Sequence, residues 1–152
     1  MLNTILTGLI CFQLNACSGS NLGPVQYPEN MEQKDTTKIK ITVGSKVFKV
    51  RLNNSATAIA FKAKLPLDLK MADLNGNEKH AELPSALPTK LSKPGTIQTG
   101  DLMLYGSDTL VLFYKTFSSS YTYSPIGRVD NPLELTKSLG NGNVTVKFEL
   151  ND

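Results

Sequence analysis

Apolar and polar residues alternate over several short stretches of this chain, which is the pattern of strands that bury one face. Residues 38–43 place two isoleucines and a valine on one face and lysine or threonine on the other. Residues 46–52 repeat the alternation after Gly44-Ser45, a dipeptide typical of a type II′ turn. The two stretches predict an antiparallel hairpin whose outer face contacts water.

The strongest strand signal lies in residues 100–117. Within it, residues 102–105 predict one strand, residues 106–108 a turn, and residues 109–117 the longest β-prone run of the chain. Residues 110–114 are consecutively apolar. A strand that is apolar on both faces is covered on both sides, so we expect this one to lie centrally in its sheet.

A short segment after residue 55 has the apolar period of a helix. It follows Asn53-Asn54-Ser55, whose side chains can cap a helix, and it ends before Pro66, because a proline disfavours helical geometry in the residue before it. The spacing predicts a buried stripe made of Ala56, Ile59, Ala60 and Ala63.

A second helix is predicted near the C-terminal end of the chain. Asn131 stands at the N-cap position and Glu134 three residues later, which is a capping-box arrangement. Leu135 and Leu139 form an apolar pair on one face, and Gly140 is typical of a helix end. We therefore expect one short amphipathic helix here.

The remaining stretches complete a mainly β fold. Further strands are predicted at residues 67–71, 79–82, 121–129 and 144–150. Residues 83–100 contain three prolines and predict a long surface loop. Eight antiparallel strands can close into a barrel that side chains fill. We therefore expect a closed or nearly closed eight-stranded antiparallel barrel over residues 38–152, with the two short helices covering its open ends.

The first 16 residues contain no charged side chain, and their apolar core, residues 5–14, is ten residues long. This length is typical of a signal peptide, whereas a transmembrane helix needs about 20 residues. The segment ends in Leu14-Asn15-Ala16-Cys17, which resembles the lipobox of bacterial lipoproteins. That resemblance implies cleavage before Cys17, lipidation of Cys17 and attachment to a membrane through acyl chains.

The predicted domain order follows from this segment. Residues 1–16 are a lipoprotein signal peptide, residues 17–37 are the lipidated cysteine with a polar flexible tether, and residues 38–152 are the barrel. The expected location is the bacterial cell envelope, at the outer membrane or the periplasmic face. The alternative is that the first residues form an apolar strand or helix of the fold, with Cys17 as a buried thiol.

Charge and metal-ligating residues exclude several classes of function. The 16 basic and 13 acidic residues give a net charge of +3, and the basic residues are 14 lysines and two arginines scattered along the chain. A nucleic-acid binder would show a basic stripe, so we expect no nucleic-acid partner. The single histidine, His80, is predicted on the exposed surface, and the barrel contains no cysteine. We therefore expect no metal and no cofactor.

The acidic residues of the third predicted strand and the turn after it allow two interpretations. Asp73 precedes Leu-Asn-Gly, a sequence in which aspartate commonly forms a turn. The alternative is a pair of carboxylates made by Asp68 or Asp73 with Glu78 or Glu82. Turn formation is the simpler prediction.

Three stretches together resemble a known family: residues 73–78, residues 100–117 and Gly127-Arg128-Val129-Asp130. Their order is similar to that of the cyclophilin-like barrel, and in particular to small bacterial cyclophilin-like domains of uncharacterised function. This resemblance implies comparison with the true cyclophilins, which are prolyl isomerases. Their catalytic arginine comes from a Phe-His-Arg stretch on the strand after the first helix. Here that strand has Lys70 as its cation, and lysine lacks the planar fork of arginine. We therefore expect a domain that binds a ligand rather than an enzyme.

A group of aromatic residues predicts where a ligand would bind. Tyr121 and Tyr123 stand among serines and threonine, a composition typical of exposed recognition surfaces. The candidate ligand groove consists of Phe117, Tyr121, Tyr123 and Arg128. The alternative is a rim of core aromatics whose hydroxyl groups contact water.

These observations predict a lipid-anchored envelope protein that binds an extended peptide or another envelope protein. A first alternative is a divergent prolyl isomerase of the envelope, in which Lys70 or Arg128 polarises the prolyl amide. A second alternative is a small-molecule carrier with its site in the barrel mouth.

Overall fold

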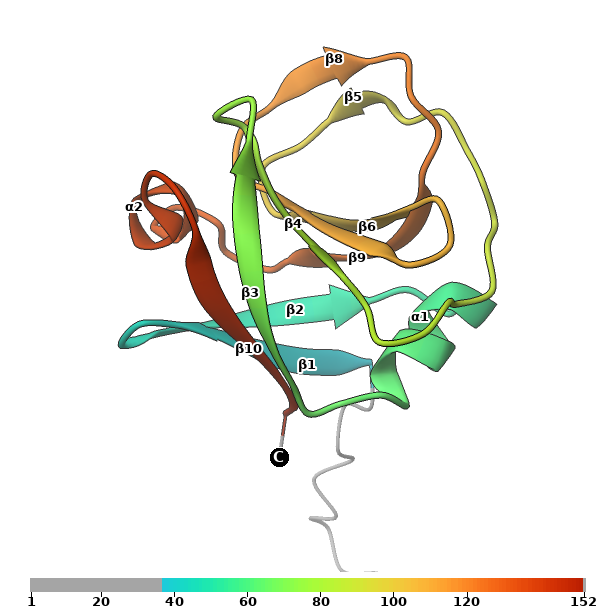
Figure 1. Cartoon of the computed structure of the whole chain (residues 1–152), viewed down its shortest axis with the longest axis horizontal. Helices are drawn as coiled ribbons and strands as arrows, with labels where there is room; N and C mark the ends of the chain where they lie inside the picture. Colours follow the sequence, from blue (N-terminus) through green and yellow to red (C-terminus); the bar gives the residue numbers. More distant parts are fainter. Residues whose placement is uncertain (1–36, 152) are drawn as a thin grey trace, which may run out of the picture. The chain divides into compact units, whose positions relative to one another are not determined.

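The computed structural model describes residues 37–151, which form the predicted mainly β domain (Figure 1). The predicted signal segment, Cys17 and the tether up to residue 36 lie outside the described residues. The strands of the main sheet are β1 (Lys38–Val43), β2 (Lys46–Leu52), β3 (Leu67–Leu74), β4 (Glu78–Glu82), β6 (Asp101–Tyr105), β7 (Thr109–Phe113), β9 (Ser124–Val129) and β10 (Val144–Leu150). The other elements are α1 (Ala56–Lys62), α2 (Leu135–Leu139), β5 (Gly95–Ile97) and β8 (Phe117–Ser119).

The eight strands of the main sheet close into an antiparallel barrel, which confirms the predicted fold. Their order around the barrel is β1-β10-β3-β4-β7-β6-β9-β2. Tight turns join β1 to β2, β3 to β4 and β6 to β7, where the sequence predicted them. At Asn75-Gly76 both residues have positive φ, 55° and 63°, which is the requirement of the type I′ turn that joins β3 to β4.

The barrel interior is filled by side chains from the inward face of every strand. Ile39 and Ile41 of β1, for example, are completely buried, as the alternating pattern predicted. Both helices add to this core. Phe61 of α1 packs edge-on against Phe148 of β10, with 5.7 Å between ring centroids, and Leu135 of α2 is also completely buried. Figure 1 shows α1 and α2 at opposite ends of the barrel.

The buried face of α1 differs from the predicted stripe. Ile59 is 63% exposed, whereas Thr57, Ala58 and Phe61 are buried. Phe61 is the largest apolar side chain of the helix and enters the barrel end, and the Thr57 hydroxyl donates a hydrogen bond of 2.7 Å to the Pro88 carbonyl. Filling the barrel end with an aromatic ring therefore decides which face of this short helix is buried.

The start of α2 also differs from the prediction. The helix begins at Leu135 with Glu134 at the N-cap, and Glu134 makes no capping hydrogen bond. Asn131 instead accepts a 3.4 Å hydrogen bond from the Leu133 amide in the preceding turn, and the Glu134 carboxylate lies 3.4 Å from the Lys46 ammonium. The predicted end at Gly140 is confirmed.

A second, smaller sheet lies where the sequence predicted a long loop and a continuous strand. β7 ends at Phe113, and the chain then pairs β8 with β5 in a two-stranded ribbon. Residues from the ribbon, from β6–β7 and from the following loop form a second core outside the barrel: Ile97, Met103, Val111, Phe113 and Tyr123, with Phe117 packed against it. The central strand β7 is thus covered on both faces, as its apolar run predicted.

Within residues 37–151, neither helix combines the length and the apolar character that crossing a membrane would need.

Candidate functional site

A pocket of about 720 Å³ lies on the outer wall of the barrel. Because side chains alternate along a strand, the residues of β3, β4 and β7 that do not fill the barrel point outward at this wall. The wall contributes Lys70 and Ala72 from β3, Glu78, His80 and Glu82 from β4, and Val111 from β7. The ribbon and the loop after it cover the adjacent part of the same wall and give the pocket one raised side.

Aromatic rings form that raised side. Phe117, Tyr121 and Tyr123 all line the pocket, together with Tyr105 of β6. The Tyr105 ring lies 6.3 Å from that of Tyr121 and 5.8 Å from that of Tyr123, between ring centroids. Tyr121 is exposed, whereas Tyr123 is 5% exposed and packs edge-on against Phe113. Burial raises the pKa of the Tyr123 hydroxyl.

Arg128 does not line this pocket. Its Nε donates a 2.5 Å hydrogen bond to the carboxylate of Asp101, which also accepts the Gln98 amide at 2.8 Å. Arg128 lies on β9, opposite Arg51 of β2 in the strand register. The structure therefore brings together three of the four predicted groove residues and places the fourth in an ion pair elsewhere.

The polar side chains of the pocket come mainly from β4. Glu78 is 8% exposed, and burial, followed by the nearby charge of Asp73, raises the pKa of its carboxyl group. His80 was predicted on the exposed surface, but it is half-buried, because β4 lies between β3 and β7 and His80 pairs with Ala72 and Val111. The sequence did not predict that Glu78 and His80 line a pocket. A polar side chain on a central strand has the same local sequence pattern as a polar side chain on an edge strand.

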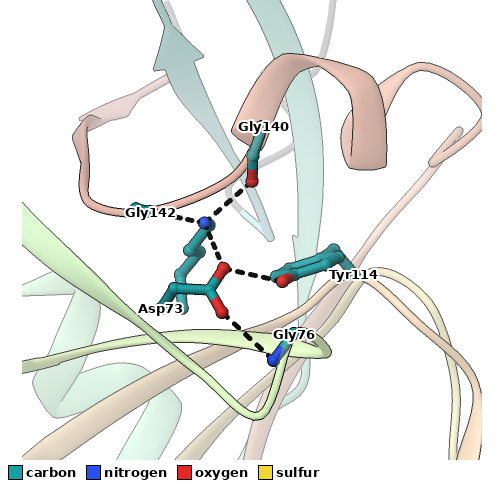
Figure 2. A network of polar contacts seen from close by, with 6 residues as sticks. Asp73, Gly76, Tyr114, Gly140 and Gly142 are labelled. Atoms are coloured by element: carbon teal, nitrogen blue, oxygen red, sulfur yellow. Dashed lines mark hydrogen bonds and ion pairs between the residues drawn. The ribbon is translucent and has the colours of Figure 1, made fainter.

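Lys79, between these two residues, points into the barrel and is completely buried. Its ammonium donates hydrogen bonds to Asp73 at 2.5 Å, to the Gly140 carbonyl at 2.9 Å and to the Gly142 carbonyl at 2.6 Å. Figure 2 shows these carbonyls and the Asp73 carboxylate converging on one point. A buried ammonium needs such a set of acceptors, because leaving it unpaired would be costly.

Asp73 has the predicted turn role and a further one (Figure 2). Its Oδ1 accepts the Gly76 amide at 3.1 Å, as a turn-forming aspartate does, and its Oδ2 accepts the Tyr114 hydroxyl at 2.7 Å. The hydrogen bonds from Lys79 and then from Tyr114 hold the pKa of Asp73 below its usual value. Burial and the hydrogen bond to Asp73 raise the pKa of Tyr114 to about 12. These groups stabilise one end of the barrel and lie behind the wall that forms the pocket.

Comparisons with known proteins agree with this architecture. The model of a family described as "Cyclophilin-like family" matches residues 41–149. Among solved structures, the solution structure of the hypothetical protein AF2241 from Archaeoglobus fulgidus is similar, with a TM-score of 0.52 and 18% sequence identity over 80% of this chain and 100% of that chain. At this identity the likeness concerns the fold alone. A comparison with curated proteins found no match.

Proposed function

The chain belongs to the cyclophilin-like family, and we propose that it is a lipid-anchored cell-envelope protein whose barrel binds an extended peptide segment of another envelope protein. The observation that supports binding is the aromatic pocket on the outer wall. Its volume lies within the range of ligand sites, roughly 300–1,000 Å³. An exposed tyrosine beside the wall of strands offers a large contact area with little loss of side-chain entropy.

The lipid anchor is supported by the sequence Leu14-Asn15-Ala16-Cys17 and by the polar segment between Cys17 and the barrel. A tether of about 20 residues spans on the order of 25 Å. That reach would hold the pocket clear of the lipid head groups and accessible to segments of neighbouring proteins.

The test is the selection of peptides from a displayed random library on the full-length protein. Selected peptides should lose about tenfold or more in affinity for Tyr121→Ala and for Tyr105→Ala, because truncating a central aromatic contact typically costs more than 1 kcal/mol. Tyr123 is unsuitable for this test, since it is buried in the second core.

Leu133→Ala is the matched control, because Leu133 is exposed and lies outside the pocket. Peptides that bind Leu133→Ala like the unchanged protein, and bind the tyrosine variants weakly, support the proposal. A library that yields no binder, or binders indifferent to both tyrosines, contradicts it.

A divergent prolyl isomerase is the second candidate, and one observation favours it. Lys70, the cation on the strand after the first helix, lines the pocket and is exposed. An ammonium there could polarise a prolyl amide bound against the aromatic side. An isomerisation assay on Ala-Pro peptides with the full-length protein tests this: catalysis should disappear in Lys70→Ala and persist in Lys137→Ala, whose side chain lies on α2.

A small-molecule carrier with its site in the barrel mouth has less support. The barrel interior is filled by the core, and α1 and α2 each place apolar side chains into its ends. A carried molecule would therefore have to use the same outer pocket as the peptide, and it would compete with selected peptides for binding.

A further inference from the structure

Glu78 is a largely buried residue whose carboxylate has no partner among the residues that the structure describes. The residue is 8% exposed, lines the outer pocket, and has no hydrogen-bond or ion-pair partner for its side chain among residues 37–151. Its neighbours in the strand register are Leu74 on β3 and Phe113 on β7. Among residues 37–151, Asn77 Oδ1 is the one side-chain polar atom that is fully buried without a partner, so the Glu78 carboxylate oxygens keep some contact with solvent. Partial burial of a carboxylate without a partner is still unfavourable, so its position requires a reason.

The cations near Glu78 are used elsewhere. Lys79 points to the other side of the wall, where Asp73 and two carbonyls hold it. Lys70 lies further along the wall: continuing the pairing of Ala72 with His80 places Lys70 opposite Glu82. The Glu82 end of the pocket therefore has a compensating charge on the neighbouring strand, whereas the Glu78 end has none.

Two further features make the Glu78 end suitable for a cation. The side-chain Oδ1 of Asn77, which also lines the pocket, is buried without a hydrogen-bond partner among the described residues. The rings of Tyr121 and Tyr123 line the same pocket, and aromatic faces attract cations. An unpaired carboxylate, a second oxygen without a donor and aromatic rings together favour a positively charged hydrogen-bond donor.

We propose that the Glu78 end of the pocket binds a cationic group, so that the recognised peptide segment carries a lysine or arginine side chain at this point. The cation would donate to the Glu78 carboxylate and lie against the tyrosine rings. The peptide part of this inference rests on the proposed function, whereas the cation site can be tested without any peptide.

The first experiment titrates the full-length protein with n-butylammonium and, separately, with n-butanol at matched ionic strength, and follows chemical shifts by NMR. Butylammonium should shift resonances of Asn77, Glu78 and Tyr121, and butanol should not. Glu78→Gln keeps the shape of the side chain and removes its charge, so it should weaken the ammonium response about tenfold or more. Glu134→Gln is the matched control, because Glu134 is exposed and lies outside this pocket, and it should leave the response unchanged.

The second experiment uses peptides selected on the full-length protein. Replacing their basic residue with norleucine should lower affinity about tenfold or more for the unchanged protein and have little effect for Glu78→Gln. Equal responses to butanol and butylammonium, or an ammonium response that survives Glu78→Gln, overturns the cation site. If peptides bind and neither probe depends on Glu78, the proposed function stands and this inference fails. If butylammonium binds at Glu78 and no peptide does, the cation site stands and the peptide-binding proposal fails.

Discussion

Lys79 is a residue whose position contradicts its usual preference for the surface. Its ammonium joins three segments of the chain, because Asp73 lies on β3 while Gly140 and Gly142 belong to the connection between α2 and β10. A buried ion pair contributes little compared with apolar packing, but removing one partner leaves the other charge unpaired. We therefore infer that the hydrogen bonds of Lys79 hold the α2–β10 connection against the barrel.

Lys79→Met should destabilise the protein by about 3 kcal/mol at neutral pH, because Asp73 and the two carbonyls lose their donor. The pKa of Asp73 is lowered in the folded state, so its contribution is present above the unfolded-state pKa and is lost as the pH falls through the folded-state pKa. The difference between the variant and the unchanged protein should therefore shrink in acid. Urea denaturation at pH 7 and near pH 3 measures it, with exposed Lys137→Met as control; a difference that stays constant with pH would argue against the Asp73 pair.

Glu78→Gln should have the opposite dependence on pH. Burial raises the pKa of Glu78 in the folded state, so the favourable contribution is complete below the unfolded-state pKa and is lost as the pH rises through the folded-state pKa. The variant should thus be more stable than the unchanged protein at pH 8 and similar to it at pH 4. Thermal denaturation at both values checks this. A variant that is less stable at pH 8 would mean that the carboxylate has a favourable partner.

At the scale of elements, the contact between β2 and β9 depends on Gly127. An added Cβ at this position would lie 2.4 Å from the Arg51 carbonyl oxygen and 3.0 Å from the Leu52 Cα, both on the neighbouring strand. Such distances leave no room for a methyl group, and the obstacle is backbone that cannot rotate away. β9 therefore approaches β2 closely at the position where it also pairs with β6.

Gly127→Ala should destabilise the barrel by roughly 1–3 kcal/mol, the usual cost of overpacking a close contact. Urea denaturation with far-UV circular dichroism measures the change. Thr145→Ala is the control, since Thr145 is exposed on β10. Equal stability of the two variants would show that β9 can shift away from β2 without loss.

The ribbon of β5 and β8 is an element with its own small core. Only three residues pair on each strand, and the core beneath it is separate from the barrel interior. We expect its amides to exchange with solvent about tenfold or more faster than those of β1 and β10, because small peripheral units open with less free energy than the whole fold. Hydrogen exchange followed by mass spectrometry checks this. Equal protection would mean that ribbon and barrel unfold together.

At the scale of the whole molecule, the alternating pattern was sufficient to predict the barrel. A barrel strand with one face in water and one face buried shows alternating polar and apolar residues. A strand that is covered on both faces shows a continuous apolar run. Both patterns can be read within the strand itself. The grouping of Phe117, Tyr121 and Tyr123 was also predictable, because these residues are close together in the sequence. Arg128 was misplaced because its partner Asp101 is 27 residues away, on a strand whose register no local pattern specifies.

Three other features could not be predicted from the local sequence: the buried face of α1, the burial of Lys79 and the β5–β8 ribbon. Ile59 fits a helical stripe as well as Phe61 does, and only the size of the barrel end decides between them. Lys79 stands at an inward position of β4, where two of its three partners come from residues more than 60 positions later. The β5–β8 ribbon consists of strands too short to give a periodic signal. In each case the missing information lies in contacts between distant segments.

The proposed membrane attachment can be tested on the whole protein in its cell. Cys17→Ser should abolish incorporation of a labelled fatty acid and move the protein from the membrane fraction to the soluble fraction, because the thiol is the predicted acceptor of the lipid. Cys11→Ser is the matched control, since Cys11 lies within the predicted signal segment and should be removed with it. Retention of label and membrane association in Cys17→Ser would contradict the anchor.

Closure of the barrel also affects how copies of the protein behave when they are crowded together. Open sheets expose unpaired backbone along their outermost strands, and such strands are templates for association between molecules. Here all eight strands of the main sheet have neighbours on both sides, and among residues 37–151 only the three-residue strands of the ribbon leave sheet edges unpaired. Molecules concentrated on a surface can therefore lie side by side at high density without a long strand edge through which aggregation could begin.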